Sequence, residues 1–266
     1  PEAKMVAFAD VVEERARHCA QKYSGNAYQD YHEMVAKEGL DACYIAVPPF
    51  AHTDQELLCS RKRMAFFVEK PVALTMKKAK EVQKSVARSG IVTQVGYVMR
   101  FYDGLQQLRQ ALKGRGGKIG LIEMVRLGGI AGDENFWWRR KELSGGQLVE
   151  QSTHQVDMAR WMVGDVSTVY AQFGRQLNRD LPNFTIEDVS TAVMKFKGGA
   201  IGVQVGDLAP AREHYFSVRA RDAAGNRSAP SPRACATTPD LTPPTVPTGV
   251  MAMALAASRA AVAWQP

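Results

Sequence analysis

The stretch DACYIAVPPFAHTDQELLCSRKRMAFFVEKP, residues 41–71, decides the fold class. It opens with a short apolar run that two prolines stop, DACYIAVPP (41–49). A helix-like segment, HTDQELLCSRK (52–62), follows, and a second apolar run, MAFFVEKP (64–71), closes the stretch. Two short buried strands joined by a helix form a βαβ unit with parallel strands. The stretch therefore predicts an α/β domain built on a parallel sheet.

The same alternation continues over the first hundred residues. We expect strands at KMVAFAD (4–10) and IVTQVGY (91–97), and helices at VVEERARHCAQKY (11–23) and TMKKAKEVQKSVARSG (75–90). This pattern predicts a Rossmann-like, doubly wound sheet, in which ligands bind at the carboxyl ends of the strands.

The second half has a different pattern. A single strongly helical segment, SGGQLVEQSTHQVDMARWMVG (144–164), interrupts a series of long apolar or alternating runs. These runs are IGLIEMVRLGGIA (119–131), VSTVYAQFGRQL (166–177), DVSTAVMKFKGGA (188–200) and IGVQVGD (201–207). Strands without intervening helices indicate an antiparallel sheet. We therefore expect an α+β domain after the first domain, with a cleft between them.

Composition excludes several classes of protein. The 266 residues are 45% hydrophobic and 23% charged, which is typical of a soluble globular protein. No apolar run approaches the roughly 18 residues of a membrane span. The net charge is +7, but the basic residues are scattered and lack interleaved aromatics, so we expect no nucleic-acid partner. The four cysteines have no C-x-x-C spacing, which argues against a metal site and for free thiols in a reducing compartment, the cytoplasm.

Asp10 is the first residue with a possible role in binding. The dinucleotide fingerprint G-x-G-x-x-G is absent from the sequence. If KMVAFAD is the second strand of a nucleotide-binding sheet, Asp10 at its end accepts hydrogen bonds from ribose hydroxyls. The alternative is that Asp10 only caps the following helix.

Two further groups of residues could carry chemistry. On a helix, Glu150, His154 and Asp157 share one face, and carboxylates beside an imidazole suit a general base. A polar helix face, a buried structural histidine and, less favoured, a metal site are the alternatives. The second group is Glu69 and Lys70 at a strand end, where the alternative is a solvated ion pair.

Several motifs in order resemble one family. They are ADVVEERA, DACYIAVPPFAH, VEKPVAL, GYVMRF and SGGQLVEQSTHQVDMARWMVGDV. Over residues 1 to about 207 the chain resembles the Gfo/Idh/MocA oxidoreductases. The resemblance implies hydride transfer between a nicotinamide cofactor and a hydroxyl-bearing carbon of a sugar or cyclitol. It also implies a homo-oligomeric assembly and, with Asp10 as a ribose ligand, NAD rather than NADP.

The resemblance also implies roles for individual residues. Lys70 lies between nicotinamide and substrate hydroxyl, Glu69 orients it, and Pro71 fixes the turn. His154 is an acid/base or a substrate ligand, Glu150 is its partner carboxylate, and Asp157 has a supporting catalytic role. The implied cofactor-binding residues are Asp10, Val47, Pro48, Pro49, His52, Glu69, Lys70 and Pro71. The implied substrate-binding residues are Arg100, Trp138, Arg139 and His154, although Trp137, Trp138, Arg139 and Arg140 could instead pack in a subunit interface.

The C-terminal part has another composition. LAPAREHYFSVRARDAAGNRSAPS (208–231) resembles the end of a fibronectin type III domain, and a Pro/Thr linker with the start of a second such domain follows. We therefore expect a chimeric or truncated chain, an extracytoplasmic location as the alternative, and a non-catalytic scaffold as the competing function. The predicted domains are a partial NAD(P)-binding domain (1–98), a truncated substrate and oligomerisation domain (99–207), a partial fibronectin-like segment (208–236), and the linker with a second segment (237–266).

Overall fold

The computed structural model describes residues 4–114, 117–129 and 132–208, and the backbone of four short strands beyond them. These strands form two antiparallel pairs, β10 (Glu213–Phe216) with β11 (Ala234–Thr237) and β12 (Val250–Leu255) with β13 (Arg259–Trp264). The chain divides into one unit of residues 1–126 and 131–206 and another of residues 127–130 and 207–266. The candidate site lies entirely in the first unit.

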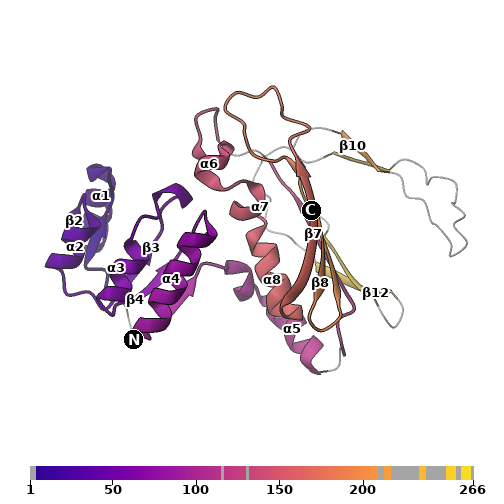
Figure 1. The fold of residues 1–266 in the computed structure, drawn as a ribbon, viewed down its shortest axis with the longest axis horizontal. Coiled ribbons are helices and arrows are strands. Elements are labelled where there is room, and N and C mark those ends of the chain that lie inside the picture. Colours follow the sequence, from indigo (N-terminus) through magenta and orange to yellow (C-terminus); the bar gives the residue numbers. More distant parts are fainter. Residues whose placement is uncertain are drawn as a thin grey trace, which may run out of the picture. The chain divides into compact units, whose positions relative to one another are not determined.

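The N-terminal part of the first unit is an α/β domain with parallel strands (Figure 1). Strand β1 (Ala7–Ala9) pairs with β2 (Asn26–Tyr28), and β3 (Ala42–Ile45), β4 (Ala65–Val68) and β5 (Thr93–Val95) form a three-stranded sheet in that order. The helices are α1 (Glu13–Tyr23), α2 (Tyr31–Lys37), α3 (Gln55–Arg61) and α4 (Met76–Ser89), with a 3-10 turn at Pro49–Ala51. The predicted parallel sheet is therefore confirmed.

Local sequence explains where these helices begin and end. The hydroxyl of Thr75 accepts a hydrogen bond from the Lys78 backbone N–H at the start of α4, and Gly90 ends the helix at φ 66°. The side chain of Asp30 caps α2 in the same way through His32 N. The hydrophobic core around β3 and β4 consists of Ile45, Cys59, Met64, Phe66 and Val68.

The second part of the unit is a four-stranded sheet with helix α8 (Thr153–Val163) packed on one face (Figure 1). The strand order is β6 (Leu121–Leu127), β9 (Ile201–Leu208), β8 (Val189–Phe196) and β7 (Val166–Gly174). The buried side chains between helix and sheet are Met124, Ala159, Ala192, Met194, Phe196 and Ala200. The remaining elements are α5 (Asp103–Gly114), α6 (Lys141–Ser144), α7 (Gln147–Glu150) and 3-10 turns at Val98–Phe101 and Trp137–Arg139.

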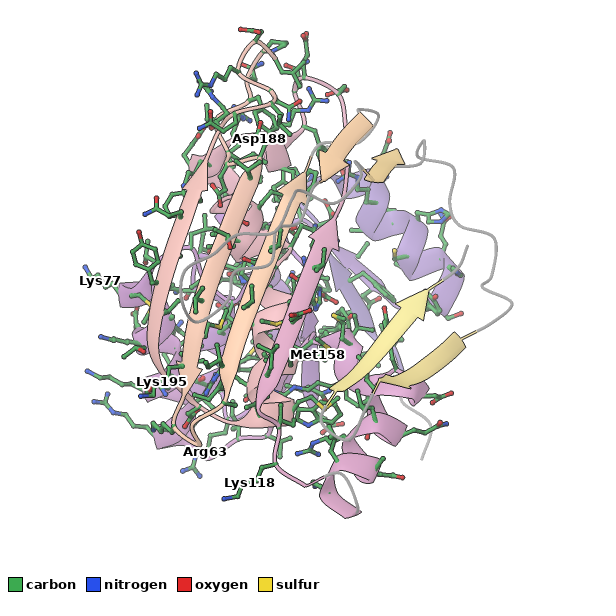
Figure 2. All side chains as sticks on the ribbon, turned by 90° about the vertical axis from the view of Figure 1, so that its right-hand side faces the viewer. Arg63, Lys77, Lys118, Met158, Asp188 and Lys195 are labelled. Carbon is green, nitrogen blue, oxygen red and sulfur yellow. The ribbon has the colours of Figure 1, made fainter. Side chains whose placement is uncertain are left out.

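The prediction of an antiparallel sheet is confirmed for β7, β8 and β9 but not for β6. Strands β7, β8 and β9 pair antiparallel. The Ile201 backbone N–H, however, donates to the Gly120 carbonyl 3.0 Å away, so β9 and β6 begin side by side. The two strands run in the same direction in Figure 2. The sheet is therefore mixed.

The predicted continuous helix over residues 144–164 was also wrong. Helix α7 ends at Glu150, and α8 begins at Thr153. The Ser152 backbone N–H donates to the Gln147 carbonyl at 3.0 Å, a bond that spans five residues and closes α7 before the next helix begins. Glu150 is thus not on one helical face with His154 and Asp157, and the argument from i, i+4 and i+7 spacing fails for it.

The sheet face opposite α8 is apolar and exposed (Figure 2). Alternate residues of the strands point to this side, because their neighbours form the core under α8. The large exposed side chains on it are Leu121, Val125, Tyr170, Val193, Ile201 and Val205. Among the described residues, no helix combines the length and apolar character needed to cross a bilayer.

Asp188, just before β8, anchors the loop that precedes it, and it lies at one end of the sheet in Figure 2. Its side chain is 2% exposed and accepts hydrogen bonds from the backbone N–H groups of Gln176, Leu177 and Asn178 at 2.6, 2.8 and 2.7 Å. The Asn178 side chain donates a fourth bond at 3.0 Å.

We predict that D188A lowers the free energy of unfolding by about 2–4 kcal/mol, because the buried donors of the loop lose their acceptor. Urea denaturation followed by far-UV circular dichroism measures the change. The matched control is D180A, at an exposed aspartate of the same loop, with an expected change within about 0.5 kcal/mol. Equal effects of the two substitutions would contradict the anchoring role.

Candidate active site

A buried ion pair joins Lys70, just after β4, to Glu150, at the end of α7. The ammonium Nζ donates to Glu150 Oε1 at 2.6 Å and to the Glu150 carbonyl at 2.7 Å. The two side chains are 14% and 9% exposed. Charged groups are rarely buried without such a partner. The sequence alone therefore selected two residues that the fold brings into direct contact.

The expected partner of Lys70, Glu69, has other contacts. Its Oε1 accepts a hydrogen bond from the Tyr44 hydroxyl at 3.2 Å. Its carboxylate also lies against Gly96, where an added Cβ would come within 2.7 Å of Oε2. The carboxylate that orients the lysine is therefore Glu150, and the assignment of that role to Glu69 was wrong.

The ion pair continues into a chain of hydrogen bonds. Gln151 Nε2 donates to Glu150 Oε2, and Arg126 Nη2 donates to Gln151 Oε1 at 2.8 Å. We call Lys70, Glu150, Gln151 and Arg126 the polar chain. Sequence reasoning missed Gln151 and Arg126. Arg126 could have been found from the alternation of side chains along β6, because it lies on the same side of the strand as the core residues Ile122 and Met124.

His154 lies in the first turn of α8, next to this chain. Its ring meets the Tyr97 ring edge-on, with centroids 6.1 Å apart, and its Nδ1 is buried without a hydrogen-bond partner. Burial lowers the pKa of His154, and the positive charge of Lys70 lowers it further, against the opposing charge of Glu150. The imidazole is therefore neutral at pH 7 and has a nitrogen available to accept a proton.

Asp157 and Arg100, both predicted site residues, bind each other. Arg100 Nε and Nη2 donate to the two carboxylate oxygens of Asp157 at 2.7 and 2.6 Å. This bidentate ion pair raises the pKa of Arg100, and it joins the 3-10 turn after β5 to α8. The structure thus places Asp157 on Arg100 and not on His154.

Helix α7, which carries Glu150, is held from the other side by Glu187. Its Oε1 accepts from the Leu148 backbone N–H at 3.2 Å, and its Oε2 accepts from Lys141 Nζ at 3.1 Å. An added Cβ at Gly146, which has φ 90°, would lie 2.5 Å from the Glu187 carboxylate. Only glycine leaves room for this contact. Glu187 therefore fixes the start of the helix that presents Glu150 to Lys70.

The predicted cofactor residues lie at or after the carboxyl ends of β1, β3 and β4. Asp10 Oδ1 accepts a hydrogen bond from the Val12 backbone N–H at 2.8 Å, just before α1. This carboxylate therefore also has the capping contact that was the alternative to a ribose contact. His52 is different, since its Nδ1 lies 2.5 Å from Glu56 Oε1 and the two side chains are 1% and 0% exposed. The imidazole of His52 is therefore buried against Glu56, its Nε2 has no hydrogen-bond partner, and its cofactor-binding role stays a prediction.

The predicted substrate residues around the Trp137–Arg139 turn are anchored locally. Trp138 is 3% exposed and packs inward. Arg139 Nη2 donates to the Gly132 carbonyl at 2.6 Å, and its own carbonyl accepts from the Thr185 N–H. The Trp137 ring meets the Phe50 ring edge-on, with centroids 6.2 Å apart, and lies tilted against the Phe136 ring at 5.4 Å. The aromatic pair thus splits into a buried Trp138 and a more accessible Trp137.

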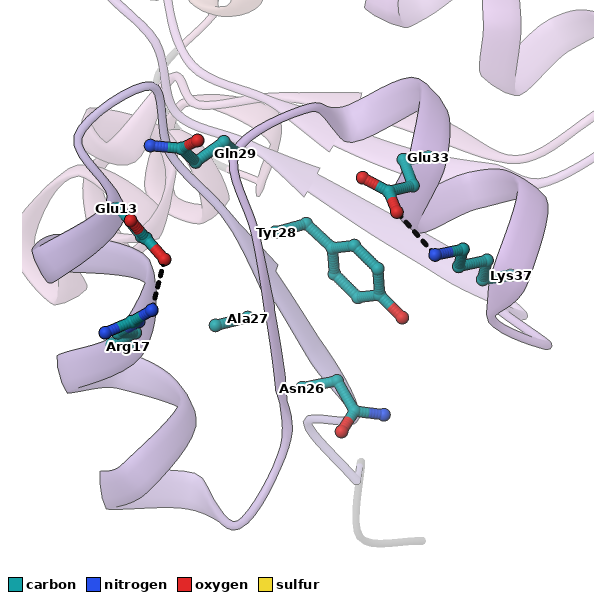
Figure 3. A pocket seen from close by; sticks show the side chains of 8 residues that line it. All are labelled: Glu13, Arg17, Asn26, Ala27, Tyr28, Gln29, Glu33 and Lys37. Atoms are coloured by element: carbon teal, nitrogen blue, oxygen red, sulfur yellow. Dashed lines mark hydrogen bonds and ion pairs between the residues drawn. The ribbon is translucent and has the colours of Figure 1, made fainter.

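A surface hollow of about 540 Å³ lies away from these residues, beside β2 (Figure 3). Its charged lining residues pair with each other, Glu13 with Arg17 and Glu33 with Lys37 (Figure 3). The Tyr28 hydroxyl donates to Glu38 at 2.5 Å, a contact that raises the pKa of Tyr28. The charged residues that line this hollow are therefore paired with each other, and the candidate active site remains the one at the polar chain.

We predict that K70M raises the pKa of His154 and that E150Q lowers it. The reason is that the ammonium disfavours the imidazolium and the carboxylate favours it. Titration of the His154 ring protons by NMR, with the exposed His18 as an internal reference, measures both shifts. Shifts of the same sign in the two variants would contradict the assigned charges.

Comparison with known proteins gives family matches for both parts of this unit. The model of the oxidoreductase family with an NAD-binding Rossmann fold matches residues 1–97, and that of the GFO/IDH/MocA C-terminal domain matches residues 105–221. The second match includes the first residues of the segment expected to be fibronectin-like.

Curated relatives and solved structures agree with these matches. The chain is 26% identical over 206 residues to myo-inositol 2-dehydrogenase of Thermotoga maritima, covering 76% of this chain and 60% of the relative. It is 27% identical over 205 residues to scyllo-inositol 2-dehydrogenase (NAD(+)) of Bacillus subtilis, covering 76% and 59%. The chain thus spans about three fifths of the length of these relatives.

The fold is also that of a solved dehydrogenase. The WlbA dehydrogenase from Bordetella pertussis, solved in complex with NADH and UDP-GlcNAcA, superposes with a TM-score of 0.71 at 24% identity. The match covers 82% of this chain and 63% of that chain. With both of its domain models matched, the chain belongs to the Gfo/Idh/MocA family of oxidoreductases.

Proposed function

We propose that the protein is an NAD-dependent oxidoreductase that transfers a hydride from a hydroxyl-bearing carbon of a sugar or cyclitol. The observation that carries this proposal is the buried Lys70–Glu150 pair beside a neutral His154, at the carboxyl end of a parallel strand. Two relatives named as inositol dehydrogenases support this choice of substrate class.

Each residue of the site has a distinct role in this proposal. A bound nicotinamide supplies the hydride acceptor. Lys70 stabilises the negative charge that develops on the substrate oxygen, because its ammonium donates hydrogen bonds where the alkoxide forms. His154 accepts the hydroxyl proton, since its ring is neutral at working pH. Glu150 is a positioning residue that holds Lys70.

The residues that would hold the cofactor follow three of the parallel strands, β1, β3 and β4. Asp10 follows β1, Val47, Pro48 and Pro49 follow β3, and Glu69, Lys70 and Pro71 follow β4. A carboxylate at Asp10 favours NAD, because it repels the 2′-phosphate of NADP.

The pyrophosphate needs a turn that this sequence does not contain. In a doubly wound sheet a glycine-rich turn after one strand supplies it. Within the described residues β1 and β3 each pair on one side only. We propose that the unpaired sides of β1 and β3 border the pyrophosphate of the cofactor.

The role of the C-terminal part and the location of the protein are also proposals. The antiparallel pairs β10–β11 and β12–β13 are compatible with fibronectin-like segments at 208–236 and 237–266. We place the protein in the cytoplasm, because Cys19, Cys43 and Cys59 are free thiols and an NAD pool is available there. The substrate-binding role of Arg139 rests on its position in the turn before α6, whereas the inward-packed Trp138 has no surface to offer a substrate.

We propose that a second copy of the chain covers the open sheet face. Its exposed large side chains come from all four strands, and a contiguous exposed apolar face is typical of a protein–protein interface. A sheet face on both partners suits a two-fold, self-complementary interface.

The enzyme assignment is tested by variants of the two catalytic residues. We expect K70M to lower turnover with inositols by about 10²–10³-fold, the magnitude expected when one transition-state donor is lost. We expect H154N to lower it by about 10²–10⁴-fold, the range for loss of a general base. The assays are NADH formation and NADH binding by fluorescence, and D10A weakens that binding. The control is K77M, at an exposed lysine in α4, with unchanged activity. A non-catalytic scaffold would give no NADH binding in any variant.

The assembly is tested by sedimentation velocity. We expect the wild-type chain to sediment as a dimer or larger, and V193E, in the middle of the open face, to sediment as a monomer. The reason is that a carboxylate in an apolar interface is left without a partner. R88E, on the exposed side of α4, is the control and should leave the assembly unchanged. A monomeric wild-type protein would refute the interface.

A further inference from the structure

We propose that Arg126 binds a carboxylate group of the substrate, so that the preferred substrate is a sugar acid. This inference rests on the oxidoreductase function proposed above and names the substrate class for the same site. It is carried by a half-buried cation that has no anionic partner among the described residues.

The position of Arg126 makes its charge unusual. Strand β6 places Ile122 and Met124 in the core under α8, and Arg126, two residues further on, lies on the same side. It stands beside the break between α7 and α8, where Gln151 receives its hydrogen bond. A cation on the covered face of a strand is unfavourable unless a counter-charge or a ligand compensates it.

The contacts of Arg126 do not supply that counter-charge. Its described hydrogen bond goes to the neutral amide of Gln151, and its Nε is buried without a partner. No ion pair of the described residues includes it, although ten others are formed. The guanidinium therefore has N–H donors and a full positive charge left for an external group.

The carboxylates of the site are already engaged elsewhere. Glu150 is paired with Lys70, and Gln151 lies between it and Arg126 as a neutral spacer. Glu69, the other carboxylate whose charge acts on His154, accepts from Tyr44 and lies against Gly96. The polar chain thus ends in one uncompensated positive charge.

The chemistry of the missing partner follows from this arrangement. The planar guanidinium matches a carboxylate through two parallel hydrogen bonds. Lys70 and Arg126 are separated by only two side chains of the polar chain. A substrate that contacts both carries its reacting hydroxyl and its anionic group on one small molecule, as in a hexuronic acid. A sugar phosphate has the same oxyanion chemistry but more charge, which suits a site with backbone N–H donors.

The test compares matched sugars that differ in one group. Binding of glucose, glucuronate and glucose 6-phosphate to the full chain is measured by isothermal titration, without cofactor and again with NAD. We expect glucuronate to bind at least tenfold more tightly than glucose. We expect R126Q to bring the ratio of glucuronate to glucose affinity close to one, and R126K to keep part of the preference for the acid. R88Q, at an exposed arginine of α4, is the control with unchanged preference.

Several outcomes would overturn the proposal. These are equal binding of glucose and glucuronate by the wild-type protein, a preference for the acid that survives in R126Q, and tighter binding of the phosphate than of glucuronate. The comparison of glucose and glucuronate binding by the wild-type protein tests the proposal even if R126Q does not fold. The proposed function fails separately, if NADH does not bind or if K70M leaves turnover unchanged. NADH binding with turnover of neutral polyols, insensitive to R126Q, keeps the function and rejects the sugar acid.

Discussion

The buried ion pair between Lys70 and Glu150 is the constraint on which the site depends. It joins two residues 80 positions apart, and one partner left alone would be an uncompensated buried charge. Removal of one member of such a pair costs about 3–5 kcal/mol. The pair forms only if α7 is correctly placed, which requires Glu187 at the start of that helix and the space that Gly146 leaves. The same contacts thus serve stability and catalytic geometry.

The fold class could be predicted from the sequence because its signals are local. Proline and glycine stop the strands and helices of the first domain near the predicted residues, and apolar runs mark the strands. The direction of β6 could not be predicted in this way. Its partner β9 is about 80 residues further along the chain, and a single strand carries no signal for parallel or antiparallel pairing. The mixed sheet therefore became visible only in the structure.

The site could be predicted in part. Lys70, Glu150 and His154 were singled out, but their pairing was not, because the spacing argument assumed one unbroken helix. Gly145 and Gly146 indicated in the sequence that the helix begins later than residue 144, because glycine is a poor helix former. In the structure both glycines have positive φ and precede α7. The break after Glu150 has no comparable signal in the sequence. Arg126 could have been found from β6, where a cation occupies a core-facing position in the alternation.

The charges of the site also decide which residue handles the proton. Glu150 holds the Lys70 Nζ with two acceptors, its carboxylate and its backbone carbonyl, so the proposed reaction has a lysine in a fixed position to stabilise negative charge. The lowered pKa of His154 keeps its ring neutral beside that cation. In the proposed reaction, the lysine polarises a substrate hydroxyl between the two groups, and this hydroxyl gives its proton to the imidazole. The resulting imidazolium lies close to Glu150, whose charge favours the protonated ring. One carboxylate thus supports both the fixed cation and the transient one.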